Sequence, residues 1–404
     1  MTSIYDPPIG TRRGSAPPGA PPAGWPVPGS PGGPGGPYGP YGYGGGGGGG
    51  PARRMRRKFL IFLYVVVIGL ASFWGLQGQQ PARQQGALSN SEIAAQVDPG
   101  LVDIVTTLGY QRAQAAGTGM VLTPSGEVLT NNHVIEGATS IKAVDVGNGR
   151  TYRAAVVGYD RSHDVAVLKL RGASGLQTVA TGNSAQVSPV EKVVAIGNAG
   201  GKGGTPSVVS GRIVALGASV TATDAAAGTS ERLTGVIGHN APIQPGDSGG
   251  PLVNLAAKVI GMNTAASSGF SLQGQAHAFA IPINRALSIA DQIESAQSSA
   301  TVHIGATGFI GVAVVSADQA QQHGVQAGSG VLIGSVFPGS PASAAGLRAG
   351  DVIVSAGGRR VGSPEALQSA LQRHHPGDRV GLAWMDQGGL RHSATVTLIK
   401  GPAG

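Results

Sequence analysis

Short apolar runs alternate with polar residues over much of the chain. Runs rich in Val, Ile and Leu, separated by Gly and Asn, recur from about residue 98 to Ile283. Short alternating runs bounded by turn residues are typical of β-strands. Because many such runs follow one another, we predict an all-β barrel domain over residues 98–285.

A helical spacing then interrupts the strand pattern. Apolar residues fall on one side of a predicted helix from about Arg285 to Gln297, with Asn284 as its cap. We expect this helix to link two domains within residues 286–304. Strand-like runs return from Gly305 to Lys400 with one further helix near Pro364–Arg373, and the size of 305–400 fits a small α+β module.

The first part of the chain has a different composition. Residues 1 to about 50 are rich in Pro and Gly and cannot bury an apolar core, so we predict a disordered tail over 1–58. Arg53–Lys58 is strongly basic and precedes Phe59–Leu76, an uncharged apolar run that suits one transmembrane helix over 59–76. Residues 77–97 form a polar, Gln-rich linker.

The basic cluster also predicts the orientation in the membrane. Positive residues stay on the cytoplasmic side, so the N-terminus is expected in the cytoplasm and everything after Leu76 outside it. A signal peptide cleaved after Ala71 or Gly75 is the alternative.

Charge and cysteine content exclude several classes of function. The net charge is +8 and the pI about 9.9, but most of the excess precedes residue 59, so no basic face for nucleic acid is predicted on a folded domain. The absence of cysteine excludes disulfides, thiolate metal sites and a cysteine nucleophile. We expect neither a cofactor nor a metal ion.

Ser248 is the first candidate for chemistry. It lies in Gly246-Asp247-Ser248-Gly249-Gly250, where glycines allow a tight turn that exposes Oγ. The backbone N–H groups of Gly246 and Ser248 would then form an oxyanion hole. Because a glycine-rich turn with a serine is common, a base and an orienting acid have to support this interpretation.

Candidates for the base and the acid lie upstream. His133 follows the strand-like segment Gly119–Thr130, and a histidine at the end of a strand can face a cleft. The other histidines in this domain are His163, His239 and His277. Asp164 begins an alternating, strand-like run, and Asp160 is the competing acid.

The order and the local motifs of these residues resemble the chymotrypsin-like clan and, within it, the HtrA proteases. The motifs are Thr130-Asn131-Asn132-His133-Val134, Asp164-Val165-Ala166-Val167-Leu168-Lys169 and the segment around Ser248. The resemblance covers roughly residues 98–400 and implies a chymotrypsin-like double six-stranded β-barrel. It implies Ser248 as nucleophile, His133 as base and Asp164, the second aspartate of its motif, as the orienting acid.

Two positions depart from the family pattern, and neither is in the triad. Most HtrA sequences have Asn at the position of Asp247, and Ala199 replaces the usual Pro after Gly197-Asn198. Asp247 could pair with a cation or face solvent.

The substrate pocket can be outlined from the same resemblance. Pro242, six residues before Ser248, occupies the position where a trypsin-specific enzyme would hold an aspartate. Ile243 lies beside it, and Thr264 and Ala265 would form the opposite wall of S1. The resemblance therefore implies small or medium aliphatic residues at P1.

The C-terminal module resembles the PDZ domains of bacterial proteases. The motifs are Gly339-Ser340-Pro341-Ala342, Ala345-Gly346-Leu347 and Gly350-Asp351-Val352-Ile353. Gly308, Phe309, Ile310 and Gly311 match the loop whose N–H groups would bind a peptide C-terminus while the peptide adds as a strand. The alternative is that Phe309 and Ile310 are core residues.

We therefore expect a serine endopeptidase that hydrolyses unfolded or signalling proteins outside the cytoplasmic membrane, in protein quality control or stress response. PDZ recognition of C-termini would adjust it. The alternatives are a catalytically silent PDZ-bearing chaperone and a scaffold that acts through the cytoplasmic tail. HtrA proteases usually form trimers through aromatic residues before the core, and Tyr110 is the nearby candidate for a homotrimer.

Overall fold

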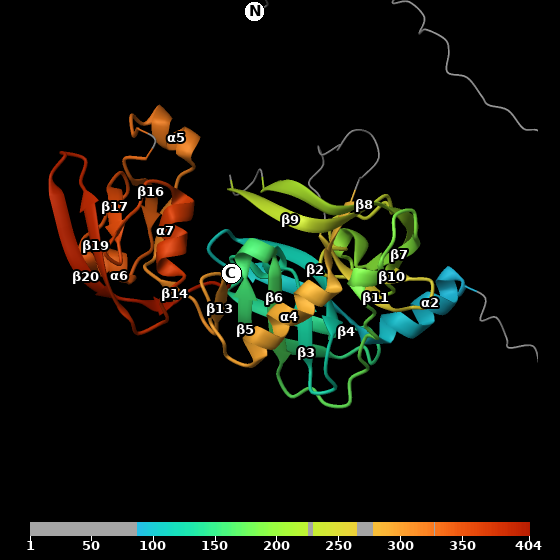
Figure 1. The fold of residues 1–404 in the computed structure, drawn as a ribbon. Helices are drawn as coiled ribbons and strands as arrows, with labels where there is room; N and C mark the ends of the chain where they lie inside the picture. Colours follow the sequence, from blue (N-terminus) through green and yellow to red (C-terminus); the bar gives the residue numbers. More distant parts are fainter. Residues whose placement is uncertain (1–86, 225–228, 265–277, 327) are drawn as a thin grey trace, which may run out of the picture. The chain divides into compact units, whose positions relative to one another are not determined.

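A computed structural model describes residues 87–404 apart from 225–228, 265–277 and 327 (Figure 1). These described residues belong to one unit of the chain. The predicted tail, the predicted transmembrane run and residues 77–86 of the predicted linker lie outside the described residues. None of the helices in the described part of the chain is long and apolar enough to span a membrane, and the span at 59–76 stays a prediction.

The polar linker predicted over 77–97 contains a helix, α2 (Asn90–Val97), which our prediction missed. Ser89 and Glu92 form a capping box: Ser89 Oγ accepts from Glu92 N at 3.3 Å, and Ser89 N donates to Glu92 Oε2 at 2.8 Å. Ile93 and Val97 are buried in the core. The Ser-x-x-Glu spacing of Ser89 and Glu92 is the sequence pattern that indicates the start of this helix.

The first barrel follows a short 3-10 turn, η1 (Asp98–Gly100). Its antiparallel strands are ordered β5-β4-β1-β2-β3-β6, and a further pairing of β5 with β6 closes the ring. The strands are β1 (Leu101–Leu108), β2 (Ala113–Val121), β3 (Glu127–Thr130), β4 (Ser140–Asp145), β5 (Thr151–Asp160) and β6 (Val165–Leu170).

The second barrel is closed in the order β10-β11-β12-β9-β8-β7. Its strands are β7 (Lys192–Gly197), β8 (Ser207–Asp224), β9 (Thr229–His239), β10 (Pro251–Asn254), β11 (Val259–Thr264) and β12 (Ala278–Pro282). Two six-stranded antiparallel barrels confirm the predicted double barrel.

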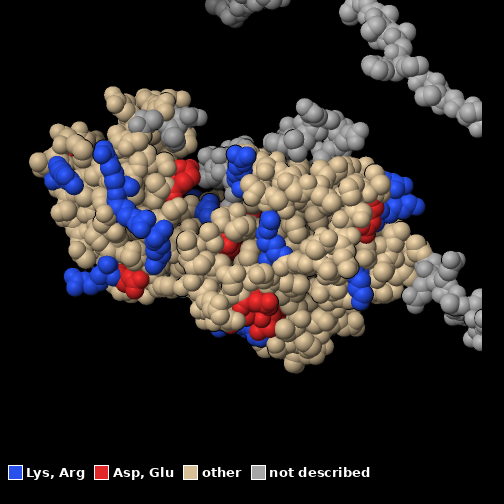
Figure 2. All heavy atoms as spheres, viewed as in Figure 1, with Lys and Arg blue, Asp and Glu red and all other residues tan. Residues whose placement is uncertain are grey.

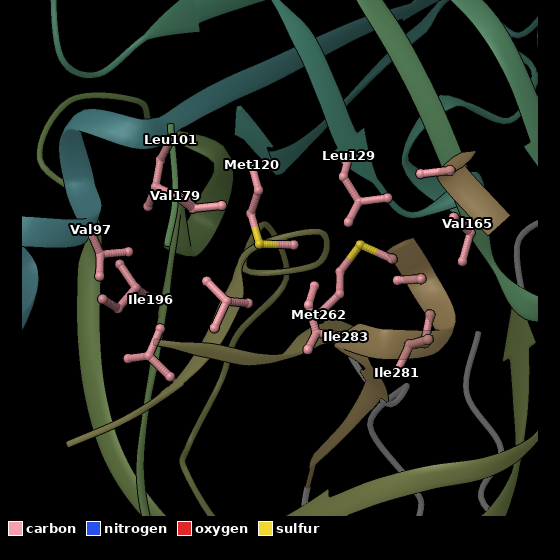
Figure 3. Packing of buried hydrophobic residues seen from close by; sticks show 14 of the residues in the cluster. Val97, Leu101, Met120, Leu129, Val165, Val179, Ile196, Met262, Ile281 and Ile283 are labelled. Atoms are coloured by element: carbon pink, nitrogen blue, oxygen red, sulfur yellow. The ribbon is translucent and has the colours of Figure 1, made fainter. Parts of the chain in front are cut away.

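A continuous apolar core joins the two barrels. Met120, Leu129 and Val165 come from the first barrel and meet Met262 and Ile281 from the second, as Figure 3 shows. Each of these five side chains is no more than 1% exposed. Because both barrels supply the same core, their facing ends are held in place, and these ends carry the candidate site.

The predicted linker helix is α4 (Ile283–Glu294), and it belongs to the core. It buries Ile283, Ala286, Ile289, Ala290 and Ile293 in the cluster shared by the barrels. The helix begins two residues before the predicted start, with Pro282 at the N-cap, so our assignment of Asn284 as the cap was wrong. Asn284 Oδ1 instead accepts from Ser184 N at 3.1 Å.

The helix also ends before the predicted bound at residue 304. Strand β13 (Val302–Ile304) follows it and pairs with the outer edge of β5. The segment 286–304 is therefore helix, turn and strand attached to the first barrel.

The C-terminal module has its own core, built around Ile310, Val331, Ile353 and Trp384. Helix α7 (Pro364–Leu371) confirms the helix predicted near Pro364–Arg373. The remaining elements are β14 (Gly308–Phe309), β15 (Val312–Val314), α5 (Ala317–Gln322), β16 (Val331–Val336), α6 (Pro341–Ala345), β17 (Val352–Ala356), β18 (Arg359–Arg360), β19 (Arg379–Met385), β20 (Arg391–Thr397) and β21 (Ile399–Lys400).

The shared core makes a prediction about stability. Met262→Ala removes a fully buried side chain and leaves a cavity between the barrels, so the free energy of unfolding should fall by about 2–5 kcal/mol. Leu216→Ala, at a side chain that is 44% exposed on β8, is the control and should change it by less than about 0.5 kcal/mol. Urea unfolding followed by circular dichroism measures both, and equal losses would contradict a shared core.

Candidate active site

His133 and Asp164 are brought together by two short turns of the first barrel. His133 lies in α3 (Asn132–Ile135), a single helical turn directly after β3. Its Nδ1 lies 3.1 and 2.9 Å from the two carboxylate oxygens of Asp164, and its backbone N donates to Oδ1 at 3.0 Å. The His133 side chain is 39% exposed and that of Asp164 is 2% exposed. The imidazole is therefore accessible to a substrate, and the buried carboxylate fixes its orientation through Nδ1.

Asp164 is oriented by an unusual backbone conformation. It follows η2 (Arg161–His163) and has φ 54° and ψ 47°, in the left-handed region. Asn131 Nδ2 donates to its carbonyl oxygen at 3.0 Å, and Thr264 Oγ1 donates to Oδ2 at 3.1 Å. Donors from two separate segments, Asn131–His133 and the end of β11, thus fix both the backbone and the carboxylate of Asp164.

The competing acid, Asp160, has a local structural role. Its carboxylate caps η2 by accepting from His163 N at 3.2 Å and from Ser162 Oγ at 2.7 Å. Its Oδ2 lies 2.8 Å from His163 Nδ1. Asp160 and His163 therefore pair with each other inside one turn, apart from His133.

The other histidines of the barrels do not meet Asp164 in the described residues. His239 is fully buried in β9, and burial lowers its pKa to about 4, so it is neutral in the barrel wall. His277 lies outside the described residues.

Ser248 lies in a turn that only glycine-rich sequence can form. Gly246 has φ 100° and Gly249 has φ 83°. A Cβ on Gly246 would lie 2.1 Å from Asn198 O, and one on Gly249 would lie 2.1 Å from Thr118 O. The turn predicted from the glycines is therefore required by backbone angle and by space.

Both barrels hold this turn. Thr118 of β2 donates from N to Ser248 O and from Oγ1 to Gly246 O, both at 2.8 Å. Gly249 N donates to Asn263 O at 2.9 Å. Because Asn263 is followed by Thr264, the end of β11 connects the serine turn to the carboxylate of Asp164.

Three of these contributors are not predicted by the sequence motifs. Thr118, Asn131 and the hydroxyl of Thr264 position the proposed triad, and no motif marked Thr118 as a functional residue. Asn131 and Thr264 lay inside quoted motifs, but only their contacts with Asp164 show what they do.

The candidate S1 residues lie in different environments. Pro242 is exposed, and Ile243 packs partly buried against the core of the second barrel. Thr264 is 4% exposed and directs its hydroxyl to Asp164. Ala265 lies outside the described residues, so the predicted pocket stays a prediction.

The predicted carboxylate-binding loop contains one core residue. Ile310 is 1% exposed and belongs to the apolar cluster of the C-terminal module, as the alternative interpretation expected for it. Gly308–Phe309 pairs with Ile399–Lys400, and the ring of Phe309 is only partly buried. Gly311 has φ 85°, and a Cβ there would lie 2.1 Å from Ser340 Cβ.

Charged side chains form no large patch on the face of the molecule shown in Figure 2. On the face shown in Figure 2 the basic and acidic residues are scattered over a largely uncharged surface. In the described part of the chain, no group of three or more His, Asp or Glu residues could hold a metal ion.

Comparisons with known proteins agree with the fold and the geometry. Residues 117–262 match the family model of the trypsin-like peptidase domain, and residues 308–397 match that of the PDZ domain. The serine protease PepD of Mycobacterium tuberculosis is 32% identical over 79% of this chain and 68% of its own length. The chain belongs to the HtrA-type serine proteases with a PDZ domain.

This chain spans less than two thirds of the length of two other curated relatives. HhoB of Synechocystis is 36% identical over 67% of this chain and 64% of its own length. A relative from Halomonas elongata, named as a DegP-like periplasmic serine endoprotease, is 35% identical over 72% of this chain and 58% of its own length. Among solved structures, the HtrA-type protease AlgW with tripeptide covers 78% of this chain and 98% of its own, with 28% identity and a TM-score of 0.43.

The contact between Thr264 and Asp164 makes a prediction for this HtrA-type chain. Thr264→Ala removes a donor to a buried carboxylate, and hydrogen bonds to charged groups contribute about 1.5–3 kcal/mol. We expect kcat/KM for casein to fall about tenfold or more, while Thr264→Ser, which keeps the hydroxyl, stays within about threefold of the unmodified chain. Equal rates for the Ala and Ser variants would show that the hydroxyl has no role.

Proposed function

We propose that this chain is a serine endopeptidase in which Ser248, His133 and Asp164 form the catalytic triad. The observation that supports the proposal is the contact between His133 Nδ1 and Asp164 Oδ2 at 2.9 Å. The carboxylate in this pair is buried, and the imidazole is partly exposed. The chain order of the three residues and the glycine turn at Ser248 add to it.

In this mechanism each residue has one task. Ser248 Oγ attacks the carbonyl carbon of the peptide bond while His133 Nε2 takes its proton. His133 then gives that proton to the leaving amine, and Asp164 holds the Nδ1–H tautomer and stabilises the imidazolium. A water molecule, activated by His133 in the same way, hydrolyses the acyl-enzyme.

The developing negative charge on the substrate oxygen needs donors that are already in place. The N–H groups of Gly246 and Ser248 are proposed as these donors, since they flank one tight turn held by Thr118. Losing one donor of this kind slows catalysis by about 100- to 1,000-fold in known cases. The rigidity of the turn is therefore part of the catalytic machinery.

Substrate selection is proposed at two places. Pro242, Ile243, Thr264 and Ala265 would border S1, and without an acid at Pro242 the pocket favours small or medium aliphatic side chains over Arg and Lys. Gly308, Phe309, Ile310 and Gly311 would bind peptide C-termini in the PDZ domain, with Ile310 contributing backbone only because its side chain is in the core.

The setting of the reaction is also a proposal. Relatives that are named as periplasmic and the uncharged run at 59–76 behind a basic cluster support an extracytoplasmic protease with a single-pass anchor. Unfolded or signalling proteins are its proposed substrates, in protein quality control and stress response. A homotrimer remains a prediction, and Tyr110 also contacts Phe309 and Phe337, with ring centroids 5.3 and 4.5 Å away.

Ser248→Ala tests the proposed activity. Removing the nucleophile should lower casein hydrolysis by about 10,000-fold or more, because no other group in the proposed site can form the acyl-enzyme. Ser125→Ala, at an exposed turn between β2 and β3, is the matched control and should keep full activity. Release of labelled casein fragments measures both variants, and equal cleavage by the two would rule out Ser248 as nucleophile.

Peptides with apolar C-terminal residues test the PDZ domain. Converting the terminal carboxylate to an amide should weaken binding about tenfold or more, because charge-assisted hydrogen bonds to loop N–H groups are lost. Fluorescence anisotropy with the Ser248→Ala chain avoids hydrolysis of the peptide. A peptide ending in Asp is the control for the preference for apolar C-terminal residues. Equal affinities for the peptide with a free C-terminal carboxylate and the peptide with a C-terminal amide would contradict carboxylate binding.

A further inference from the structure

Asp247, which lies between the two proposed oxyanion-hole donors, is a buried acid that the mechanism does not use. It is 2% exposed. Its Oδ2 accepts from Gln244 N at 2.8 Å, and its Oδ1 accepts from Ser207 Oγ at 3.0 Å. The carboxylate therefore fastens the start of the serine turn to β8.

The surroundings of Asp247 are close-packed and uncharged. A Cβ on Gly197 would lie 2.8 Å from Asp247 Oδ1, so the carboxylate fills the space beside the end of β7. The groups that face it from β7, β8 and the serine turn are Gly197, Ser207 and Gln244. None of the ion pairs found among the described residues includes Asp247.

Titratable groups near this region lie on neighbouring segments. Asp103 of β1 accepts from Gly204 N at 3.2 Å, on the loop that follows Asn198, and Lys202 of the same loop is exposed. His133 and Asp164 pair directly with each other at 2.9 Å. Burial raises the pKa of Asp247, in agreement with a carboxylate that has no ion-pair partner among the residues the structure describes.

The hydrogen bonds around Asp247 suit a neutral side chain equally well. Ser207 Oγ lies 3.1 Å from Gly197 O as well as 3.0 Å from Asp247 Oδ1, so its single proton has two acceptors. If an amide replaced the carboxylate, its NH₂ would donate to Ser207 Oγ and the Ser207 proton would turn to Gly197 O. The amide oxygen would still accept from Gln244 N.

We propose that Asp247 positions the oxyanion hole through its hydrogen bonds while its negative charge opposes the charge that develops there. This inference rests on the proposed function. The residues on both sides of Asp247 supply the N–H groups that face the oxyanion, and two like charges in a partly desolvated site repel each other. A tenfold change in rate corresponds to about 1.4 kcal/mol of such repulsion in the transition state.

The effect should appear in kcat alone. The substrate carbonyl is neutral in the ground state and becomes negative only in the transition state, so the charge of Asp247 raises the barrier without weakening substrate binding. Replacing the carboxylate by an isosteric amide keeps the hydrogen bonds and removes the repulsion.

Three variants of the full chain test the proposal with labelled casein at pH 8. Asp247→Asn should raise kcat about tenfold with KM unchanged. Asp247→Ala, which loses the charge and both hydrogen bonds, should lower kcat at least tenfold because the turn is no longer held. Asp145→Asn is the matched control: Asp145 is also buried with a raised pKa, but it caps Asn148 at the end of β4, and kcat should not change.

The outcomes separate the two parts of the proposal. Unchanged or lower kcat in Asp247→Asn overturns the role of the charge. An Ala variant as active as the Asn variant overturns the role of the hydrogen bonds.

A second measurement does not depend on activity. Because the pKa of Asp247 is higher in the folded chain than in the unfolded one, unfolding releases a proton between these two values and stability falls as pH rises through that window. We therefore compare the Ser248→Ala chain with the Ser248→Ala, Asp247→Asn double variant. The melting temperature of the double variant should rise relative to that of the single variant as pH increases from 4 to 8. Equal melting temperatures across this range would overturn the proposal that Asp247 carries a buried, uncompensated charge.

Failure of the proposed function would look different. If neither the unmodified chain nor any variant cleaves casein, the protease assignment fails, and with it the effect on kcat. The pH-dependent difference in melting temperature would still decide whether Asp247 carries an uncompensated charge.

Discussion

The carboxylate of Asp164 is the contact on which the arrangement of the site depends. It accepts from the backbone and ring of His133 in the first barrel and from Thr264 in the second. A buried carboxylate is costly unless donors satisfy it, and one of these donors, Thr264, lies 100 residues from Asp164 in the chain. The carboxylate therefore needs both barrels docked in one position, and that position also sets where Ser248 lies.

The apolar core makes this docking possible. Met120 and Leu129 of the first barrel pack against Met262 and Ile281 of the second, and α4 closes the cluster. The polar site lies at strand ends that lead directly out of this core: β3 into His133 and β11 into Thr264. Side chains in a close-packed core resist displacement, so the hydrogen bonds at its margin are held to short distances.

Two histidine and aspartate pairs in one domain show why sequence proximity is a poor guide to chemistry. Asp160 and His163 are three residues apart and pair closely, yet their contact caps one turn of 3-10 helix. His133 and Asp164 are far apart in sequence and meet because β3 and β6 are neighbours in the barrel. The second pair has its acid buried and its imidazole partly exposed, which is the arrangement a base requires.

Local patterns in the amino-acid sequence are enough to predict much of the fold and of the candidate site. The alternating runs predicted the barrels, the glycines predicted the turn at Ser248, and the motifs placed His133, Asp164 and Ser248 in one family. These features are local, because they follow from backbone angles, side-chain period and short spacings. The helix α2 was equally local, and its capping box was overlooked.

The packing of the two barrels determines which groups surround those residues. Thr264 was assigned to the wall of a pocket, and its hydroxyl reaches Asp164 because β11 ends beside the first barrel. Asp247 could have faced solvent or a cation, and it faces Gly197, Ser207 and Gln244 instead. Helix α4 was predicted as a linker, and its apolar side lies in the core. Contacts between distant segments depend on how the barrels pack, and no short spacing in the sequence records that packing.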